Sequence, residues 1–470
     1  MNSILLGGFV AAMATGLPIA LAMVLASLLY IWFSGTIPPL TVVHRMVGGV
    51  DSFPLLAVPF FILAGSLMNS AGITNRIYNF ALALVGWLKG GLGHVNVVGS
   101  VIFAGMSGTA IADAGGLGTI EIKAMRDHGY PTEFALGITA ASATLGPIIP
   151  PSLPLVIYGV QANVSIGRLF AGGFVPGVLM ALFMMAMVGY YAHVRKYGSD
   201  IAFSWPRMGR AFFELGFVAA TAVGLYFLWS HPDLPGWLRF GALLVVTMAA
   251  DKVFRFEAYM ALLTPVILIG GMATGLFTPT EAAVAAVAWA LFLGFVWYRT
   301  LTWRMLVKIS MDTIESTAVV LFIVAAASIF AWVLTTTRLT EAIAVWVLSI
   351  SDNPIVFLLL VNLFLLFVGC FMETIAAITI LVPVLLPIVA KLGIDPVHFG
   401  LVMILNLMIG LLTPPVGMVL FVLQKVARVS FEATVRAVLP WLWPLLATLA
   451  LITYVPQLVL WLPDLVYGAK

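Results

Sequence analysis

The sequence predicts an all-α polytopic membrane protein with two repeats, each containing a re-entrant helical hairpin and a broken transmembrane helix. Of its 470 residues, 62% are hydrophobic and 9% charged, and the mean hydropathy is +1.13. Apolar stretches of membrane-spanning length recur from end to end. Two of them are interrupted by doubled prolines, Pro150-Pro151 and Pro414-Pro415, which lie 264 positions apart. A continuous helix is not possible at such a pair.

The two interruptions also suggest a function. In lipid, the freed backbone groups survive only where protein buries them or where they line a wet cavity. One proline kink would favour a purely structural explanation. A matched pair in two halves, each preceded by a glycine (Gly146 and Gly410), instead indicates a transporter's binding site. Carbonyls at a break suit a sodium ion, whereas amides and the positive end of the helix dipole suit a carboxylate.

The expected elements follow from apolar runs and helix breakers. The run 4–33 lacks the basic start and the small-residue cleavage site of a signal peptide, so we expect it to be the first span. The other expected elements are spans at 54–70 and 74–88, a re-entrant candidate at 92–125, a broken helix at 133–162, a span at 169–194, shorter runs at 211–229, 237–250, 258–276 and 280–298, then 315–336, 339–350 and 355–371, a second re-entrant candidate at 372–391, a broken helix at 398–424, and apolar runs to the end. The run 237–250 is short for a span and could instead lie in the membrane interface.

Landmarks around the breaks recur in one order at nearly one offset. Gly129-Tyr130-Pro131 precedes the first broken helix and Gly393-Ile394-Asp395-Pro396 precedes the second. Upstream, the segment 105–113 corresponds to 369–377. We interpret this as duplication of a fold unit. The sequence leaves open whether the halves are inverted or parallel.

The charged residues indicate orientation rather than a nucleic-acid partner, since the net charge is only +3. Lys and Arg cluster at 195–210, 252–255 and 299–308, while the turns 230–236 and 275–281 contain none. The positive-inside rule therefore places the three clusters in the cytoplasm, with two hairpins between them.

Small and hydroxyl residues between apolar arms mark the two candidate hairpin tips, within 105–113 and 369–377. Such residues allow the backbone to approach an ion and supply side-chain oxygens. Close helix packing is the alternative explanation of the same composition.

Two acids, Asp113 and Glu373, lie in otherwise apolar segments. Intramembrane carboxylates are costly and suggest ion sites or proton relays, but a salt bridge or a hydrogen bond to hairpin backbone is about equally expected. Glu121 and Lys123 either join such a network or lie at an interface. We assign neither a catalytic role.

Several classes of site are not predicted. Thr278-Pro279-Thr280-Glu281 has the spacing of a helix capping box. The single cysteine, Cys370, excludes an intrachain disulfide and a zinc cluster, and the six histidines have no paired metal spacing. Because no nucleotide-binding loop or catalytic acid–base cluster is visible, we expect neither ATP hydrolysis nor another enzyme activity. A channel would need a continuous polar pore, and none is apparent.

Several of these runs resemble a known family, the large membrane subunit of tripartite ATP-independent periplasmic (TRAP) transporters of the DctM type. The most specific is Gly-Pro-Ile-Ile-Pro-Pro-Ser at 146–152, and the resemblance extends over most of the chain. The other runs are 105–113, 129–131, 277–283 and 412–417.

The resemblance implies an elevator-type, sodium-coupled carrier of the bacterial inner membrane, in which a transport domain slides against a scaffold. It implies a separate small four-helix membrane subunit, a periplasmic solute-binding protein and an organic acid anion as substrate. A self-sufficient sodium–dicarboxylate or anion carrier is the alternative.

Carried onto this chain, the resemblance gives expected sites and domains. The sodium ions (Na⁺) would be bound at Ser107, Gly108, Thr109, Gly146, Pro147, Pro150, Gly369, Glu373, Thr374, Gly410, Thr413 and Pro414. The substrate would contact Ser107, Thr109, Ser152, Thr374 and Thr413. The expected domains are N-terminal scaffold helices at 1–91, the first transport repeat at 92–165, central scaffold helices at 166–335, scaffold or arm helices at 336–371, the second transport repeat at 372–428, and C-terminal helices at 429–470.

Residues 206–255 depart from the family pattern, where a shorter connection is expected. We expect two extra short membrane segments there, which pack against the small subunit or a lipid.

Overall fold

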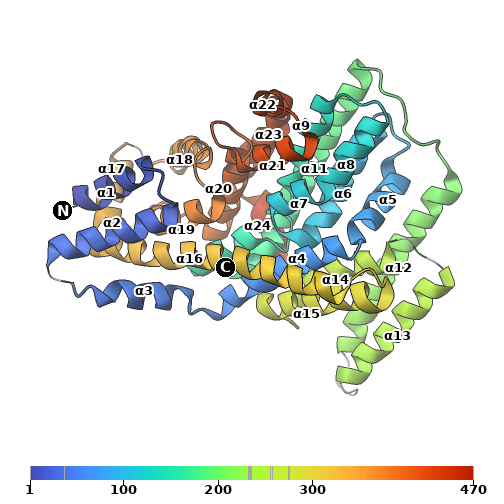
Figure 1. Ribbon diagram of the computed structural model, residues 1–470, viewed down its shortest axis with the longest axis horizontal. Coiled ribbons are helices and arrows are strands. Elements are labelled where there is room, and N and C mark those ends of the chain that lie inside the picture. Colours follow the sequence, from blue (N-terminus) through green and yellow to red (C-terminus); the bar gives the residue numbers. More distant parts are fainter. Residues whose placement is uncertain are drawn as a thin grey trace.

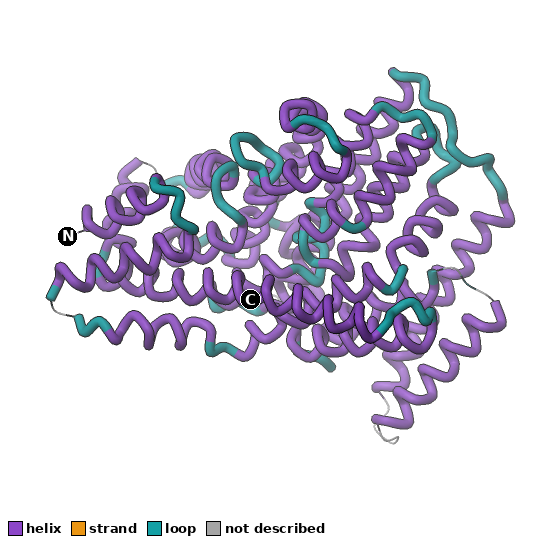
Figure 2. The backbone as a smooth tube through the Cα atoms, viewed as in Figure 1, coloured by secondary structure: helices purple, strands orange, loops and turns teal. Residues whose placement is uncertain are grey.

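The computed structural model describes residues 2–35, 37–230, 236–254, 256, 258–273, 276–350 and 352–468. Within these residues the regular structure is helical, apart from an isolated bridge between Lys89 and Ser199 (Figure 2). Six of the helical segments are long and apolar enough to cross a membrane. The predicted all-α polytopic class is therefore confirmed.

The N-terminal region differs from the prediction of one span at 4–33. It forms two helices, α1 (Asn2–Ala14) and α2 (Ile19–Ser34), which pack against each other. The chain turns between them because Gly16 adopts a positive φ of 83° and Pro18 cannot continue a helix. A further helix, α3 (Leu40–Val50), was not predicted. Together with α16 (Trp303–Thr336), these helices form the end of the molecule at the left of Figure 1.

The first half continues with short helices around turns. Its elements are η1 (Phe53–Leu56), α4 (Ala57–Ser70), α5 (Ile73–Val85), α6 (Gly91–Ser107), α7 (Ala110–Gly115), α8 (Leu117–Asp127), α9 (Thr132–Ala143), α10 (Leu153–Ala162) and α11 (Ile166–Val194). The stretch 92–125 thus forms two helical arms around a turn at 108–109, and 133–162 forms two helices separated by the first Pro-Pro pair.

The middle of the chain contains α12 (Trp205–Ser230), α13 (Gly236–Phe254), α14 (Tyr259–Ala273), α15 (Pro279–Leu291) and the π-helical turn η2 (Phe292–Trp297). The short run 237–250 belongs to α13, which has 19 residues. Helices α12 and α13 project at the lower right of Figure 1. The predicted turns at 230–236 and 275–281 lie partly outside the described residues. The predicted capping box is confirmed, since Thr278 and Glu281 bond each other's backbone N–H at the start of α15.

The second half contains α17 (Leu339–Ile350), α18 (Pro354–Gly369), α19 (Thr374–Lys391), α20 (Pro396–Gly410), α21 (Met418–Ala427), α22 (Phe431–Val438), η3 (Leu439–Trp441), α23 (Leu442–Tyr454) and α24 (Gln457–Tyr467). The prediction of a re-entrant element within 372–391 is wrong, because α19 is one continuous helix. Its Pro383 and Pro387 lie one turn apart, and neighbouring helices allow such prolines inside a membrane helix. The turn lies before α19, at 370–373, so any hairpin here has α18 as its first arm.

Corresponding elements of the two halves start at similar offsets. α9 begins at Thr132 and α20 at Pro396, and each is followed by a break that contains a cis Pro-Pro bond. The next helices, α10 and α21, begin at Leu153 and Met418. Both halves therefore present helix, turn, helix and interrupted helix in the same order.

The main hydrophobic core joins these two sets of helices. α11 packs along α6, α20, α23 and α24, whereas α19 packs against α10, α16 and α17. A smaller core connects α1, α2 and α3 with the second half of α16. The two turns, at 108–109 and 370–373, contribute to one cavity, and residues 145–152 of the first break are buried beside it.

Candidate functional site

The first tip lies between α6 and α7 and is held against the first break. Gly108 has a φ of 64°, and a Cβ atom there would lie 2.6 Å from the Pro151 carbonyl oxygen, so only glycine fits. The Leu153 amide donates a hydrogen bond to the Gly108 carbonyl (3.3 Å). The Thr109 side chain caps α7 by accepting from the Ala112 amide (3.2 Å). Tip and break thus form one backbone-linked unit.

The first break, residues 145–152, is buried throughout. Ser152 caps α10: its hydroxyl accepts from the Leu155 amide (3.3 Å) and donates to the Pro147 carbonyl (2.5 Å). These bonds stabilise a stretch of backbone that cannot form helical hydrogen bonds. The hydroxyl expected to contact substrate is therefore engaged inside the break.

The second tip, between α18 and α19, is fixed in a comparable way. The Val416 amide donates to the Cys370 carbonyl (3.2 Å). Gly369 and Gly410 bring their backbones together, since a Cβ atom on Gly410 would lie 2.5 Å from the Gly369 backbone. This close approach joins the second tip to the end of α20, just before the second break.

Of the roles expected for Glu373, the structure shows a hydrogen bond to the hairpin backbone. Its Oε2 accepts from the amides of Ile375 (2.9 Å) and Ala376 (3.1 Å) and so caps α19. A carboxylate at a helix N-terminus also interacts favourably with the helix dipole.

The second break differs from the first in its exposure. Pro414 and Pro415 are exposed, and Thr413 is half-buried. The Thr413 hydroxyl donates to the Ile409 carbonyl (2.8 Å), one turn back in α20.

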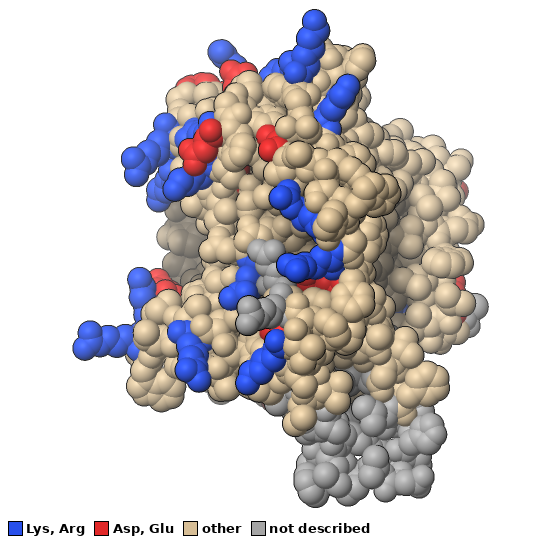
Figure 3. Space-filling view, turned by 90° about the vertical axis from the view of Figure 1, so that its right-hand side faces the viewer, with Lys and Arg blue, Asp and Glu red and all other residues tan. Residues whose placement is uncertain are grey.

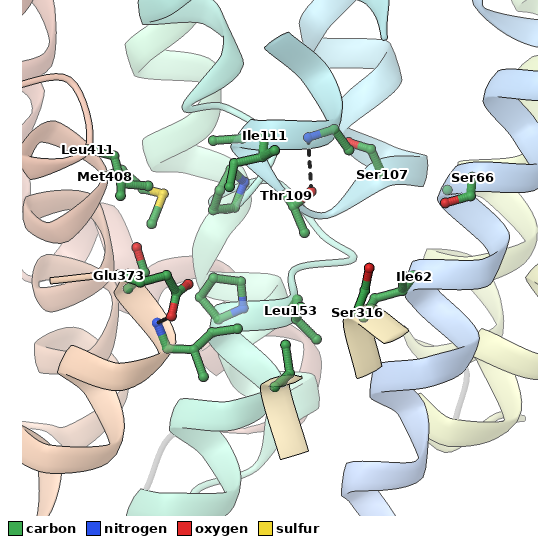
Figure 4. A pocket seen from close by; sticks show the side chains of 18 residues that line it. Ile62, Ser66, Ser107, Thr109, Ile111, Leu153, Ser316, Glu373, Met408 and Leu411 are labelled. Carbon is green, nitrogen blue, oxygen red and sulfur yellow. Dashed lines mark hydrogen bonds between the residues drawn. The ribbon is translucent and has the colours of Figure 1, made fainter. Parts of the chain in front are cut away.

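Both tips converge on one cavity of about 330 Å³ (Figure 4). Ser107 and Thr109 of the first tip and Glu373 and Thr374 of the second line it. Further walls come from the first break, from the end of α20 and from α4 and α16: Pro147, Leu153, Met408, Leu411, Gly65, Ser66, Ser316 and Val320. The cavity therefore lies where elements from both halves meet two other helices.

Two hydroxyls in this cavity have no hydrogen-bond partner among the described residues. These are Ser107 Oγ, on a side chain that is 4% exposed, and Thr374 Oγ1, on one that is 2% exposed. Buried polar atoms without a partner are rare and cost about 1–3 kcal/mol each. One of them lies on each tip, so both tips present an unpartnered oxygen at this cavity.

The structure thus brings together only part of the expected site. Ser107, Thr109, Pro147, Glu373 and Thr374 line the cavity. The four glycines Gly108, Gly146, Gly369 and Gly410 instead allow close backbone contacts between tips and breaks. Ser152, Pro150, Thr413 and Pro414 do not line the cavity.

Sequence reasoning missed Ser66 on α4 and Ser316 on α16. Both lie on helices without a Pro-Pro break, and α16 contains several other Ser and Thr residues, so nothing in the sequence singles out these two hydroxyls.

A second polar cluster lies between the first hairpin and α9. The Asn96 amide donates to Glu121 (2.7 Å) and to Thr139 (2.8 Å), and Ser142 donates to the Asn96 carbonyl oxygen (2.6 Å). Ser100 donates a long hydrogen bond to Asp113 (3.4 Å). Both acids are buried, and Asp113 Oδ2 and Glu121 Oε1 lack partners in the described part of the chain.

Lys123 is not part of this cluster, because it lies on the exposed face of α8. Among the described residues no group of three or more His, Cys, Asp or Glu side chains could hold a metal ion. A metal centre of clustered side chains is therefore not present in that part of the chain.

Comparison with known proteins identifies the family. The model of the "Tripartite ATP-independent periplasmic transporter, DctM component" matches residues 6–458. The sialic acid TRAP transporter large permease protein SiaM of Vibrio cholerae is 44% identical and covers 98% of each chain. The C4-dicarboxylate large permease protein DctM of Pseudomonas aeruginosa is 38% identical over 88% of this chain and 87% of that one.

Solved structures show the same fold at low sequence identity. The YdaH transporter of Alcanivorax borkumensis superposes with a TM-score of 0.57 at 16% identity, covering 88% of this chain and 87% of that one. MtrF of Neisseria gonorrhoeae gives a TM-score of 0.53 at 12% identity, covering 88% and 83%. The fold is thus shared with other transporters.

Proposed function

Because this chain belongs to the DctM family of TRAP transporter permeases, we propose that it is the large transmembrane subunit of a sodium-coupled importer of an organic acid anion. Family membership and the membrane-length helices make it a multi-pass protein of the bacterial inner membrane and a permease rather than an enzyme. The word tripartite implies two partners, and we infer that these are a small four-helix membrane subunit and a periplasmic solute-binding protein.

The pair of buried, unpartnered hydroxyls on the two tips supports sodium binding most directly. Sodium is a hard cation that prefers oxygen ligands, and the breaks beside both tips leave carbonyl groups outside helical hydrogen bonding. We propose one ion between Ser107–Thr109 and the break 146–150, and a second between Gly369–Thr374 and the break 410–414. Gly108, Gly146, Gly369 and Gly410 contribute by close backbone approach.

The acid in the cavity supports coupling between cation and substrate. Glu373 lines the space between the tips, so an anionic substrate placed there meets a carboxylate. Two like charges about 4 Å apart repel each other by about 4 kcal/mol in a partly buried site. A cation bound at the second tip removes this repulsion, and substrate binding would then require sodium.

The substrate class follows from the same cavity. The hydroxyls of Ser107, Thr109 and Thr374 suit a polar anion, and the relatives named above carry sialic acid and C4-dicarboxylates. We propose a sugar acid or a dicarboxylate of that size. Ser152 and Thr413 were also expected to contact substrate, and we now assign them to the internal structure of the breaks.

For the movement, we propose an elevator in which the two tips and the two broken helices slide together against a scaffold. The scaffold would contain α1–α5 and α12–α17, whereas the expectation from the sequence also placed α11 and α18 in scaffold or arm segments. α11 packs along α6, α20, α23 and α24, so we propose that it travels with the transport body rather than with the scaffold. The recurrent order of elements supports an origin by duplication.

Uptake into proteoliposomes tests this function. The vesicles would contain this chain and its small subunit, with and without the binding protein, under an inward sodium gradient, and would be offered labelled sialic acid and C4-dicarboxylates. We expect uptake that requires both sodium and the binding protein. Uptake without the binding protein would instead establish a self-sufficient carrier, and uptake driven equally by a potassium gradient would contradict sodium coupling.

A further inference from the structure

Two arginines at the start of α12 line a groove between that helix and α5. Arg207 and Arg210 face a cavity of about 640 Å³ whose other wall includes Asn79, Phe80 and Ala83 of α5. The loop that enters α12 contributes Ser204. Lys and Arg side chains are prominent on this face of the molecule (Figure 3).

Neither arginine has a salt-bridge partner in the described part of the chain. The acid of the same groove, Glu214, is 2% exposed, and its Oε1 accepts a hydrogen bond from the Ala258 amide (2.6 Å). Arg207 also lies in the first turn of α12, at the positive end of the helix dipole, where cations are disfavoured. A bound anion would relieve both the mutual repulsion and the unfavourable dipole.

The surroundings of the groove are those of a membrane interface. Trp205 is 72% exposed beside the arginines, and Phe203, which is 45% exposed, stacks edge-on between Trp205 and Trp87. Exposed aromatic rings next to cations are typical of the level of the lipid headgroups. Further along α12, Phe212 and Phe213 are also exposed, so the groove continues into an apolar surface. The positive-inside rule places this end of α12 on the cytoplasmic side.

We propose that this groove binds the phosphate headgroup of an anionic phospholipid from the cytoplasmic leaflet. Arg207 and Arg210 would donate charge-assisted hydrogen bonds to the phosphodiester oxygens, and the acyl chains would lie over the exposed apolar residues of α12. A basic pocket between helices on the cytoplasmic side is the geometry that recognises such headgroups. The lipid would anchor α12, and with it the segment 206–255, to the leaflet.

Native mass spectrometry of the purified chain, titrated with phosphatidylglycerol or phosphatidylcholine, tests this proposal. We expect tighter binding of phosphatidylglycerol and a loss of about tenfold or more in its affinity in the double variant Arg207→Gln/Arg210→Gln. Inorganic phosphate at millimolar concentration should not displace the lipid.

The chain offers a matched control at the start of α16. Trp303, also 72% exposed, is followed by Arg304 and Lys308, which line none of the cavities described here. Arg304→Gln/Lys308→Gln removes the same charge at a similar helix start and should leave affinity within about twofold.

Three results would overturn the proposal: equal losses in the two double variants, equal binding of both lipids, or displacement of phosphatidylglycerol by phosphate. Displacement by the small subunit would also overturn it and assign the groove to that subunit. Lipid binding requires no transport, so these outcomes are independent of the proposed function.

Discussion

The two Pro-Pro breaks share a glycine four residues before the proline pair, but they differ in their surroundings. The first is buried throughout, from residue 145 to 152, whereas Pro414 and Pro415 of the second are exposed. Each is linked to its tip by one backbone hydrogen bond, from Leu153 to Gly108 and from Val416 to Cys370. The local turn is therefore set by the prolines, while access to the break is set by what packs over it.

Helix α11 explains the difference. Its Gly173 and Gly177, four residues apart, lie directly against the Ile148 carbonyl and the Ile149 side chain, in space that any side chain would fill. At the corresponding positions of the second half, 264 residues later, the chain has Ala437 and Trp441. Two glycines thus lie against the first break, whereas one of the two corresponding positions in the second half is a tryptophan.

The polar networks behind the breaks also differ. In the first half Asn96 and Ser142 connect to the buried acid Glu121, while in the second half Asn406 donates to Asn362 (2.9 Å) and Asn362 to Thr453 (3.0 Å), so that network is neutral. Buried carboxylates are costly without compensation. The halves thus share geometry but place their charge differently.

The largest effect should come from removing the prolines. Pro150→Ala/Pro151→Ala lets the helix continue through a fully buried break, so we expect sodium-driven uptake to fall by about 100-fold, because misplacing a site by about 1 Å has effects of that order. Pro414→Ala/Pro415→Ala changes an exposed break and should cost about tenfold or less. Uptake into proteoliposomes, normalised to incorporated protein, measures both.

If the Pro150→Ala/Pro151→Ala variant took up substrate as fast as the wild type, the first break would not be part of the binding site. Equal losses in both variants would show that exposure of the break does not matter.

The next effect concerns the cover over the first break. Gly173→Val places a side chain against the Ile148 backbone, which cannot move aside, so we expect about 3 kcal/mol of destabilisation. Gly189→Val is the matched control in the same helix, since a Cβ atom there meets nothing within 4 Å. Thermal melting of the detergent-solubilised protein measures the difference. Similar melting of the two variants would mean that α11 does not pack closely over the first break.

A smaller effect is expected at the tips. Ser107→Ala and Thr374→Val each remove one unpartnered hydroxyl. If that oxygen contributes about 1.4 kcal/mol to the free energy of sodium binding, its loss should raise the sodium concentration for half-maximal uptake about tenfold. Ser66→Ala, in the same cavity but on α4, should change it by less than about twofold. An unchanged sodium dependence in both tip variants would exclude these hydroxyls as ligands, and a change in only one would assign sodium coupling to that half.

Much of this architecture could be predicted because prolines and glycines determine backbone geometry locally. The breaks at Pro150 and Pro414 and the turn at Gly108 follow from such residues alone. Pro18 likewise marks a helix start. The single span predicted across it is wrong because the apolar run 4–33 continues through a proline that begins a new helix.

The features that could not be predicted depend on contacts between residues far apart in the sequence. Ser66 and Ser316 reach the cavity only because α4 and α16 pack beside the tips. The continuity of α19 through two prolines likewise depends on its neighbours. The exposure of the second break, by contrast, had a signal in the sequence, because the position that corresponds to Gly177 is Trp441 rather than a small residue.

The smallest effect separates the hydroxyls of the two breaks. Ser152→Ala leaves the buried Pro147 carbonyl and Leu155 amide without their partner, so we expect a loss of about 1–2 kcal/mol. Thr413→Ala removes a hydroxyl that only bonds back to Ile409 on a half-exposed turn, where the carbonyl keeps access to other donors, and should cost less than about 0.5 kcal/mol. Melting temperatures of the two variants give the comparison. If Thr413→Ala instead impaired uptake strongly while leaving melting unchanged, its hydroxyl would belong to the substrate or ion path, and the exposed break would be the functional one.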